Sequence, residues 1–266
     1  MSAGVATIAS RTRPHRPGVI SAALVFGSRT LVKLRRTPAQ LFDVAVHPVV
    51  FTLMFTYLFG GAIGGSPGRY LTELVPGILT MTLLVTTGTT GAALSIDLAN
   101  GVYDRFRTLS VRPIAPLLGA LLGDLVRYAL ASMVVIGLGL VLGFRPHGNA
   151  LGVVAAALLV LAFCASLSWV WTALALVMKS PGAVLGVTQA LLYPLSLFSN
   201  IFIAPATLPG GLQAFVSANP VTHLVTATRE LMSGTVTASH ILWILLACVT
   251  MTAVFAPLSL HLFRRG

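Results

Sequence analysis

The sequence predicts an all-α polytopic membrane protein, and three observations support that prediction. Hydrophobic residues make up 56% of the 266 residues, and charged residues make up only 9%. The mean hydropathy is +0.92. Charge-free stretches of about 20 residues, the length that crosses a bilayer, recur along the chain. Because a soluble domain carries about 25% charged residues to cover its surface, this composition excludes a soluble globule, a disordered chain and a disulfide-rich secreted module.

Residues 1–18 form a polar, basic segment. They contain Arg11, Arg13 and Arg16, and the apolar stretch behind them is short and lacks a small-residue cleavage site. A secretory signal is therefore not expected. We predict a disordered basic cytoplasmic tail.

Residues 19–37 predict an amphipathic helix. At 100° per residue, apolar residues fall on one side and cations on the other. The apolar residues are Ile20, Leu24 and Leu31, and the cations are Arg29, Lys33 and Arg36. A helix of this kind lies in the membrane interface with its cations toward lipid phosphates. Pro38 ends it, and residues 38–266 are predicted to form a single transmembrane domain.

Six charge-poor stretches predict six transmembrane helices. They are residues 44–63, 74–96, 117–144, 149–178, about 181–204, and 241–260. The third carries Asp124 and Arg127 in its first turns, near the inner interface, and the i, i+3 spacing favours a structural ion pair. We therefore expect no ionisable residue at mid-depth in any span.

The cations predict the orientation. With the N-terminus inside, 13 of the 17 Lys and Arg residues fall on the cytoplasmic side and 3 fall outside, as the positive-inside rule requires. The inner set is Arg11, Arg13, Arg16, Arg29, Lys33, Arg35, Arg36, Arg105, Arg107, Arg112, Lys179, Arg264 and Arg265, and the outer set is Arg69, Arg145 and Arg229. Both termini are therefore predicted to be cytoplasmic. No basic run is interleaved with stacking aromatic residues, so nucleic-acid binding is not expected.

The predicted cytoplasmic loop over residues 97–113 contains a short amphipathic helix. Val102, Phe106 and Leu109 share one face, and charged residues flank them. Two interpretations remain open from the residues alone. The helix packs on lipid as an interfacial helix, or its apolar anchors dock into a groove of a soluble partner.

A long outer stretch predicts a re-entrant helix pair. Residues 180–228 contain no Asp, Glu, Lys or Arg, yet prolines interrupt the stretch, so it cannot form one continuous helix. We predict half-inserted helices over residues 208–216 and 221–232, with Asn219 capping the second and Pro220 at its first position. Asn219 and Pro220, together with Asn200 in the fifth span, are the predicted pathway or gate residues, since a buried polar side chain in a span is costly.

Three stretches then give the sequence a family resemblance. They are NGVYDRFRTL at residues 100–109, LPGGLQAF at 208–215 and NPVTHLVTATR at 219–229. In their order among the predicted helices, they resemble the ABC-2 type transporter permeases. The chain is most similar to the daunorubicin-resistance group of exporter membrane subunits, from about residue 19 onward.

The resemblance implies a function and partners. It implies an ATP-driven exporter in a bacterial cell membrane that moves a hydrophobic or amphipathic substrate, either a drug or antibiotic or a lipid-like molecule. It implies a second permease copy, identical or related, and two copies of a separate ATP-binding subunit. The loop becomes a coupling helix that docks on that subunit through Tyr103, Asp104, Arg105, Phe106 and Arg107. The helix with Arg29, Lys33 and Arg36 becomes the connecting helix.

The residues add several exclusions. No phosphate-binding G-x-x-x-x-G-K-[ST] motif occurs, so ATP and Mg are expected on the partner, with no cofactor and no metal on this chain. No catalytic constellation can be assigned, so an enzyme is not expected. Glu73 and Glu230 are expected to be solvated at outer helix ends. Most threonines of the second span are expected to bond their own backbone, although they could instead line a polar pathway.

One alternative function remains from the residues alone, which is a secondary transporter or channel without an ATPase. Such proteins usually carry intramembrane ionisable residues and paired broken helices. The expected absence of a mid-depth charge counts against this alternative.

Overall fold

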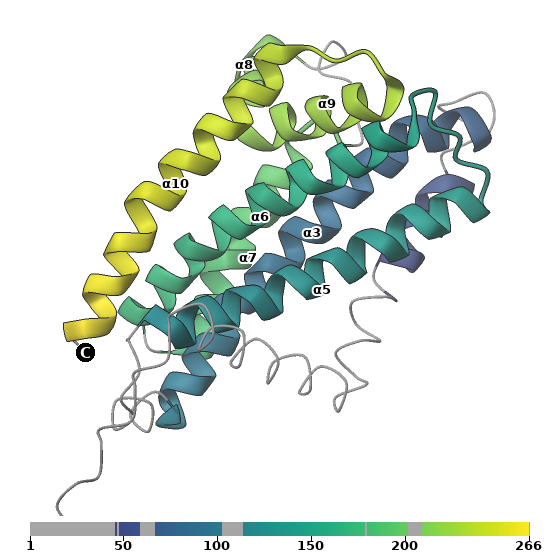
Figure 1. Ribbon diagram of the computed structural model, residues 1–266. Helices are drawn as coiled ribbons and strands as arrows, with labels where there is room; N and C mark the ends of the chain where they lie inside the picture. Colours follow the sequence, from purple (N-terminus) through teal and green to yellow (C-terminus); the bar gives the residue numbers. More distant parts are fainter. Residues whose placement is uncertain are drawn as a thin grey trace, which may run out of the picture.

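The computed structural model describes residues 46, 48–58, 67–102, 114–178, 180–201 and 209–265. The described residues form helices and the turns between them, so the predicted all-α class is confirmed (Figure 1). The helices are α3 (Pro67–Ala99), α5 (Ile114–Val141), α6 (Ala150–Met178), α7 (Pro181–Leu197), α8 (Gly210–Ala218), α9 (Pro220–Ser233) and α10 (Ala238–Arg265), with a further apolar helix at Pro48–Leu58.

Four of these helices are long and apolar enough to cross a membrane. They contain the candidate spans Tyr70–Ala99, Ala115–Val141, Ala150–Met178 and Ala238–Arg264. The other two predicted spans correspond to the shorter helices Pro48–Leu58 and α7. The structure therefore supports four spans by length and composition, and the prediction of six is not confirmed. Residues 1–45 and 103–113, which carry the predicted tail, connecting helix and most of the coupling loop, lie outside the described residues.

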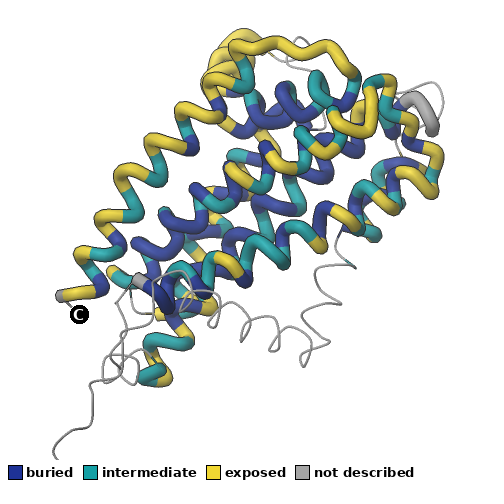
Figure 2. The backbone as a smooth tube through the Cα atoms, in the orientation of Figure 1, coloured by how far each residue is buried: buried dark blue, intermediate teal, exposed yellow. Residues whose placement is uncertain are grey.

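The helices pack around α3 and α6. Helix α3 contacts α5, α6, α7 and α9, whereas α10 packs on α6 and α9 (Figure 1). Among the four candidate spans α3 is the most buried and α10 the least, and in Figure 2 the buried backbone follows α3 and α6. Helix α3 is therefore the central element of the bundle.

Glycines on α3 allow its close packing. A Cβ atom added at Gly91 would lie 2.9 Å from a methyl carbon of Val184 and 3.0 Å from the carbonyl oxygen of Trp171. One added at Gly88 would lie 2.8 Å from a methyl carbon of Thr188. Small residues permit such close approach between helices where the surroundings are as apolar as the side chains.

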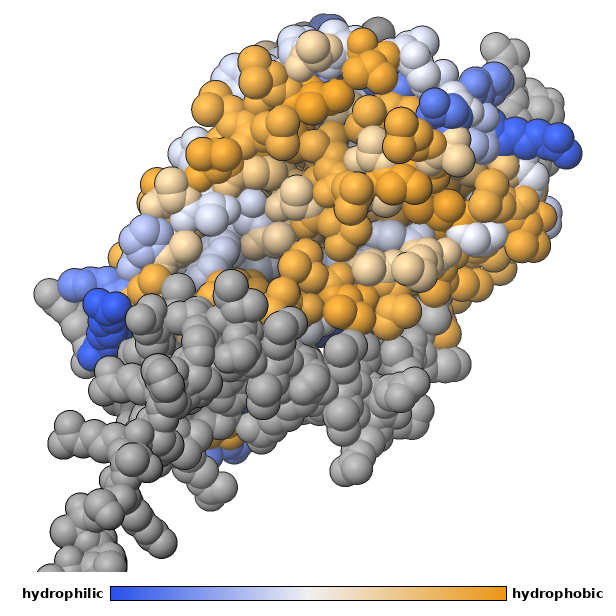
Figure 3. Space-filling view, in the orientation of Figure 1, coloured by the Kyte–Doolittle hydropathy of each residue, from blue (hydrophilic) through white to orange (hydrophobic). Residues whose placement is uncertain are grey.

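The outer surface of the bundle is largely apolar. Large hydrophobic side chains are exposed on α10, among them Leu242, Trp243 and Val249, and on α5, among them Met133 and Val141. Figure 3 shows hydrophobic residues covering much of the visible face. A soluble monomer rarely exposes so large an apolar surface, so this surface fits contact with lipid chains.

The predicted re-entrant pair corresponds to α8 and α9. Both lie at one end of the bundle (Figure 1), which we call the cap end. Helix α9 begins at Pro220 with Asn219 as its N-cap and ends at Gly234, whose φ of 83° is left-handed. At the opposite end, buried residues of α3, α5, α6, α7 and α10 form a small separate cluster: Leu94, Leu117, Ala175, Val184 and Phe263.

Candidate functional site

An ion pair lies well inside the helix bundle. Asp124 and Arg127 of α5 approach to 2.9 Å, and their side chains are only 13% and 15% exposed. Helix α5 begins at Ile114, so Asp124 lies about 15 Å along it at ~1.5 Å per residue. The predicted ion pair between Asp124 and Arg127 is confirmed. The helix begins three residues before the predicted span, which places Asp124 in its third turn.

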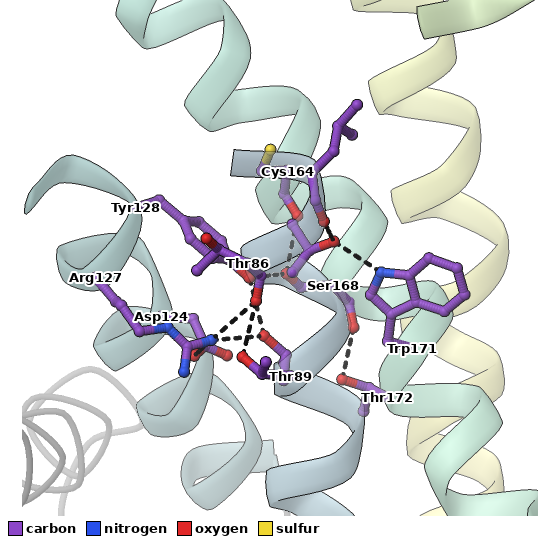
Figure 4. A network of polar contacts seen from close by, with 12 residues as sticks. Thr86, Thr89, Asp124, Arg127, Tyr128, Cys164, Ser168, Trp171 and Thr172 are labelled. Atoms are coloured by element: carbon purple, nitrogen blue, oxygen red, sulfur yellow. Dashed lines mark hydrogen bonds and ion pairs between the residues drawn. The ribbon is translucent and has the colours of Figure 1, made fainter. Parts of the chain in front are cut away.

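The pair extends into a polar network that joins three helices (Figure 4). Arg127 Nη2 donates to the backbone carbonyl of Thr86 and to the Thr90 hydroxyl, both at 3.3 Å. The Thr90 hydroxyl lies 2.9 Å from that of Tyr128, which lies 2.8 Å from that of Ser168. Residues of α3, α5 and α6 thus meet in one chain of hydrogen bonds within the core.

The direction of these hydrogen bonds follows from proton counting. Ser168 donates its only hydroxyl proton to the carbonyl of Cys164 at 2.8 Å, so it accepts from Tyr128. Arg127 donates to the Thr90 hydroxyl. That hydroxyl also faces Tyr128 and the Asp124 carboxylate, so its single proton can serve only one of these two acceptors at a time. A buried network satisfied in this way is stabilising, while a broken one leaves costly unpaired groups.

The threonines of α3 divide into two groups. Thr80, Thr86, Thr87 and Thr89 each donate to a backbone carbonyl three or four residues earlier, as predicted. Thr87 also accepts from the indole nitrogen of Trp171 at 3.0 Å. Thr90 instead bonds across to α5. The expectation, which covers most of these threonines, is therefore confirmed, and Thr90 is the exception.

A pocket of about 400 Å³ lies beside the network. One face of α3 lines it, together with Phe51 of the Pro48–Leu58 helix, Arg127, and Gln189 and Tyr193 of α7. Pockets of this size accommodate drug-sized molecules. Because Arg127 lines the pocket, the network and the pocket form one continuous site.

A second polar site holds α9 against the end of α7. The Asn219 side-chain oxygen accepts from the backbone N–H of Val221 at 2.9 Å, so the predicted N-cap is confirmed. Its amide nitrogen also donates to the carbonyl oxygens of Leu195 and Phe198, at 2.7 and 2.8 Å. Pro220 occupies the first position of α9, as predicted.

Asn200 lies at the turn that follows α7. It is 8% exposed and donates to the Thr226 hydroxyl of α9 at 2.8 Å. Its side-chain oxygen is buried without a partner among the described residues. The structure thus brings Asn200 and Asn219 to the same junction of α7 and α9, although they are distant in sequence.

Arg229 of α9 joins the cap to α3. Its side chain lies 3.3 Å from the carboxylate of Glu73, and it donates to the backbone carbonyls of Glu73 and Ile201 at 3.1 Å. Burial lowers the pKa of Arg229, and the charge of Glu73 acts in the opposite direction. The Glu73 side chain is 70% exposed, so its predicted solvation is confirmed.

Glu230 does not fit the prediction that it is solvated. Its side chain is only 17% exposed and lies 3.0 Å from His240 Nδ1 of α10. It also accepts from the backbone N–H of Thr237 at 3.2 Å. The turn after α9 folds back over this carboxylate, which the sequence pattern could not indicate.

Comparison with known proteins decides the family. The family model described as ABC-2 type transporter matches residues 22–233. The chain belongs to the ABC-2 type transporter family. The predicted resemblance is thereby confirmed.

Two relatives are similar over most of this ABC-2 permease. It is 44% identical over 252 residues to the daunorubicin resistance ABC transporter permease protein DrrB1 of Streptomyces coeruleorubidus. The aligned region covers 95% of this chain and 89% of that relative. It is 31% identical over 212 residues to the doxorubicin resistance ABC transporter permease protein DrrB of Mycobacterium tuberculosis. The aligned region covers 78% of this chain and 72% of that relative.

Membership assigns the chain its place in the transporter. An ABC-2 permease is the membrane component of an ABC transporter and is not itself a catalyst. Within the described residues, no group of three or more His, Cys, Asp or Glu could hold a metal ion.

The predicted site residues of the permease fall into two groups. Asn200, Asn219 and Pro220 lie together at the cap end. The predicted docking residues Tyr103, Asp104, Arg105, Phe106 and Arg107 and the connecting-helix cations Arg29, Lys33 and Arg36 lie outside the described residues. Tyr128 and Ser168 were missed, because a single Tyr or Ser in an apolar helix gives no periodic signal.

Proposed function

We propose that this permease exports an anthracycline-like drug across a bacterial cell membrane, driven by ATP hydrolysis on a separate subunit. The observation that carries the proposal is the 44% identity over 95% of the chain to a daunorubicin resistance permease. Support also comes from a drug-sized pocket within an otherwise apolar bundle. Two ATP-binding subunits, each carrying ATP and Mg, and a second permease copy complete the transporter.

The docking step is assigned to the coupling loop. Tyr103, Asp104, Arg105, Phe106 and Arg107 contact the ATP-binding subunit, and the basic connecting helix with Arg29, Lys33 and Arg36 lies beside it. Apolar anchors flanked by charges are suited to a groove on a soluble partner. In this topology both termini are cytoplasmic, and six helices cross the membrane, with the Pro48–Leu58 helix and α7 belonging to the first and fifth.

The gate is assigned to the cap end. Helices α8 and α9 close the outer exit, and movement of α7 opens it. The proposal is supported by the direct bonds from Asn219 to the end of α7 and from Asn200 to α9. Because these contacts join the two elements, a shift of α7 must either move α9 or break the bonds.

A vesicle transport assay tests the function. The permease is coexpressed with the ATP-binding subunit of a daunorubicin-resistance transporter, and daunorubicin uptake into inverted membrane vesicles is measured. We expect uptake that requires ATP and is abolished when the phosphate-binding lysine of the ATPase is replaced by Ala. Uptake that persists without ATP and collapses with a protonophore would instead establish the secondary transporter.

Copurification tests the docking. Phe106→Ala should release the ATP-binding subunit, since truncating a central aromatic anchor commonly costs about 2 kcal/mol or more. Phe215→Ala is the matched control, because Phe215 is an exposed residue of α8 at the cap end. Undiminished copurification with Phe106→Ala would assign the loop to the lipid interface.

A further inference from the structure

The pocket lies between the Pro48–Leu58 helix, α3 and α7. Part of its wall is apolar and aromatic, and another part is polar. The apolar part includes Phe51, Ile78 and Val85, and Tyr193 adds an aromatic ring. Thr82, Thr86 and Thr89 follow one face of α3, with Arg127 and Gln189 on the neighbouring walls. Few polar groups in a mainly apolar cavity are typical of a site that orients a small molecule.

The lining offers hydrogen-bond acceptors on α3 and α7. The hydroxyls of Thr86 and Thr89 donate their protons to backbone carbonyls, at 2.7 and 2.9 Å. Their oxygen lone pairs therefore remain available. The side-chain oxygen of Gln189 is buried and has no partner among the described residues. A buried acceptor without a partner costs free energy. Because Gln189 lines the pocket, rotation of its amide toward the cavity brings this oxygen to a ligand donor and removes that cost.

The charge in the lining excludes one class of ligand head group. Arg127 is the only charged residue that lines the pocket within the described chain, and its Nε is buried without a partner there. Asp124 neutralises much of that charge at 2.9 Å but is not part of the lining. An ammonium group would face a cation and no free carboxylate. An uncharged hydroxyl would find acceptors, and a carbonyl would find the guanidinium.

We propose that this pocket binds the uncharged, hydroxylated aromatic part of the transported molecule, and that a positive charge on the molecule stays outside it. This inference rests on the proposed export function and names the substrate chemistry that its site selects. The aromatic rings of Phe51 and Tyr193 supply stacking surfaces. Gln189 and the α3 threonines accept from ligand hydroxyls, and Arg127 donates to a ligand carbonyl. A lipid acyl chain would leave the Gln189 side-chain oxygen and the Arg127 Nε without partners.

Equilibrium binding to the purified permease in lipid nanodiscs, without the ATPase, tests the proposal. Three probes are used, which are daunorubicin, its aglycone daunomycinone without the amino sugar, and tetraphenylphosphonium, an aromatic cation without hydroxyl groups. The aglycone should bind within about threefold of the parent drug, because the sugar cation lies outside the pocket. Tetraphenylphosphonium should bind at least about tenfold more weakly, since it loses the hydrogen bonds and meets Arg127.

Two substitutions in the pocket, each with a matched control elsewhere, test where the aglycone binds. Gln189→Leu removes the buried acceptor and should raise the daunomycinone Kd by about threefold to tenfold, the worth of one hydrogen bond. Gln213→Leu makes the same chemical change on exposed α8 and should leave Kd unchanged. Ala93→Trp, on the pocket wall, should abolish binding by filling it, whereas Ala253→Trp on the exposed face of α10 should not.

Each outcome decides the proposal. An unchanged Kd for Gln189→Leu in monodisperse protein overturns it, as does tighter binding of tetraphenylphosphonium than of daunomycinone. Lipid that stays bound in wild type but is lost from Ala93→Trp, with no effect on aglycone binding, would assign the pocket to an acyl chain. Since the assay contains no ATPase, these failures are distinct from failure of ATP-driven export, which the vesicle assay measures separately.

Discussion

The amide nitrogen of Asn219 lies 2.7 Å from the carbonyl oxygen of Leu195, and the same side chain caps two helices. Its oxygen accepts from Val221 at the start of α9, and its nitrogen reaches the last carbonyls of α7. The residue is 3% exposed. Both helix ends carry backbone groups without intrahelical partners, so one buried amide satisfies a donor of one helix and acceptors of the other.

Replacing Asn219 by Asp separates its two roles. Asp and Asn are equivalent as N-caps, so an ordinary cap would tolerate the change. Here the substitution places a carboxylate against two carbonyl oxygens, and we expect Asn219→Asp to destabilise the permease at least as much as Asn219→Ala. The loss for Ala should be about 0.5–2 kcal/mol. Thermal unfolding in detergent measures both, and a stable Asp variant would contradict the double cap.

The hydrogen bond between Tyr128 and Ser168 should show energetic coupling. A double-mutant cycle with Tyr128→Phe and Ser168→Ala should give a coupling free energy of about 0.6 kcal/mol, the average for hydrogen bonds between membrane helices, and at most about 1.7 kcal/mol. Tyr128→Phe combined with Thr188→Ala is the control, because Thr188 bonds only its own helix at Val184. The two effects should then be additive. Denaturant unfolding in detergent supplies the free energies.

The Asp124–Arg127 pair should tolerate joint removal better than single removal. Asp124→Asn leaves a mostly buried guanidinium without its counter-charge, and breaking a buried pair in this way costs about 3–5 kcal/mol. The double variant Asp124→Asn with Arg127→Gln buries no charge and should regain much of the lost thermal stability. If the stability loss of the double variant equals the sum of the losses of the two single variants, the two charges do not stabilise each other.

Gly152 should not tolerate a side chain. A Cβ atom at this position would overlap the carbonyl oxygen of Leu231 on α9. Gly152→Ala should therefore displace α9 from α6 and lower the unfolding temperature, because overpacking costs about 1–3 kcal/mol. Gly137→Ala is the matched control on α5, where a Cβ meets nothing within 4 Å. Equal stability of both variants would show that α6 and α9 can separate freely.

Labelling of single cysteines tests the orientation of the bundle. Gly210 and Gly182 lie at the starts of α8 and α7, and a Cβ at either meets nothing within 4 Å. In a background without Cys164 and Cys248, Gly210→Cys should react with a membrane-impermeant maleimide in intact cells. Gly182→Cys should react only after lysis. The reverse pattern would invert the predicted topology.

The sequence determined the class and many of the elements, because hydropathy acts locally along the chain. Charge-free length located the helices that became α3, α5, α6 and α10. Proline and asparagine chemistry located the start of α9, where Asn219 and Pro220 play the predicted roles. The shared motifs indicated the family that the comparison confirms. These features depend on residues that are close neighbours in the chain.

Only the tertiary structure decided which polar groups meet. Thr90, Tyr128 and Ser168 lie on three helices, and nothing in the order of residues predicts that their hydroxyls form one chain. Glu230 was expected in water but lies beside His240, because the turn between α9 and α10 covers it. Hydropathy reports how much apolar surface a segment must bury. The partner of each buried polar group depends on how helices rotate and shift against one another, which is decided by packing at close approaches such as Gly88 and Gly91 on α3.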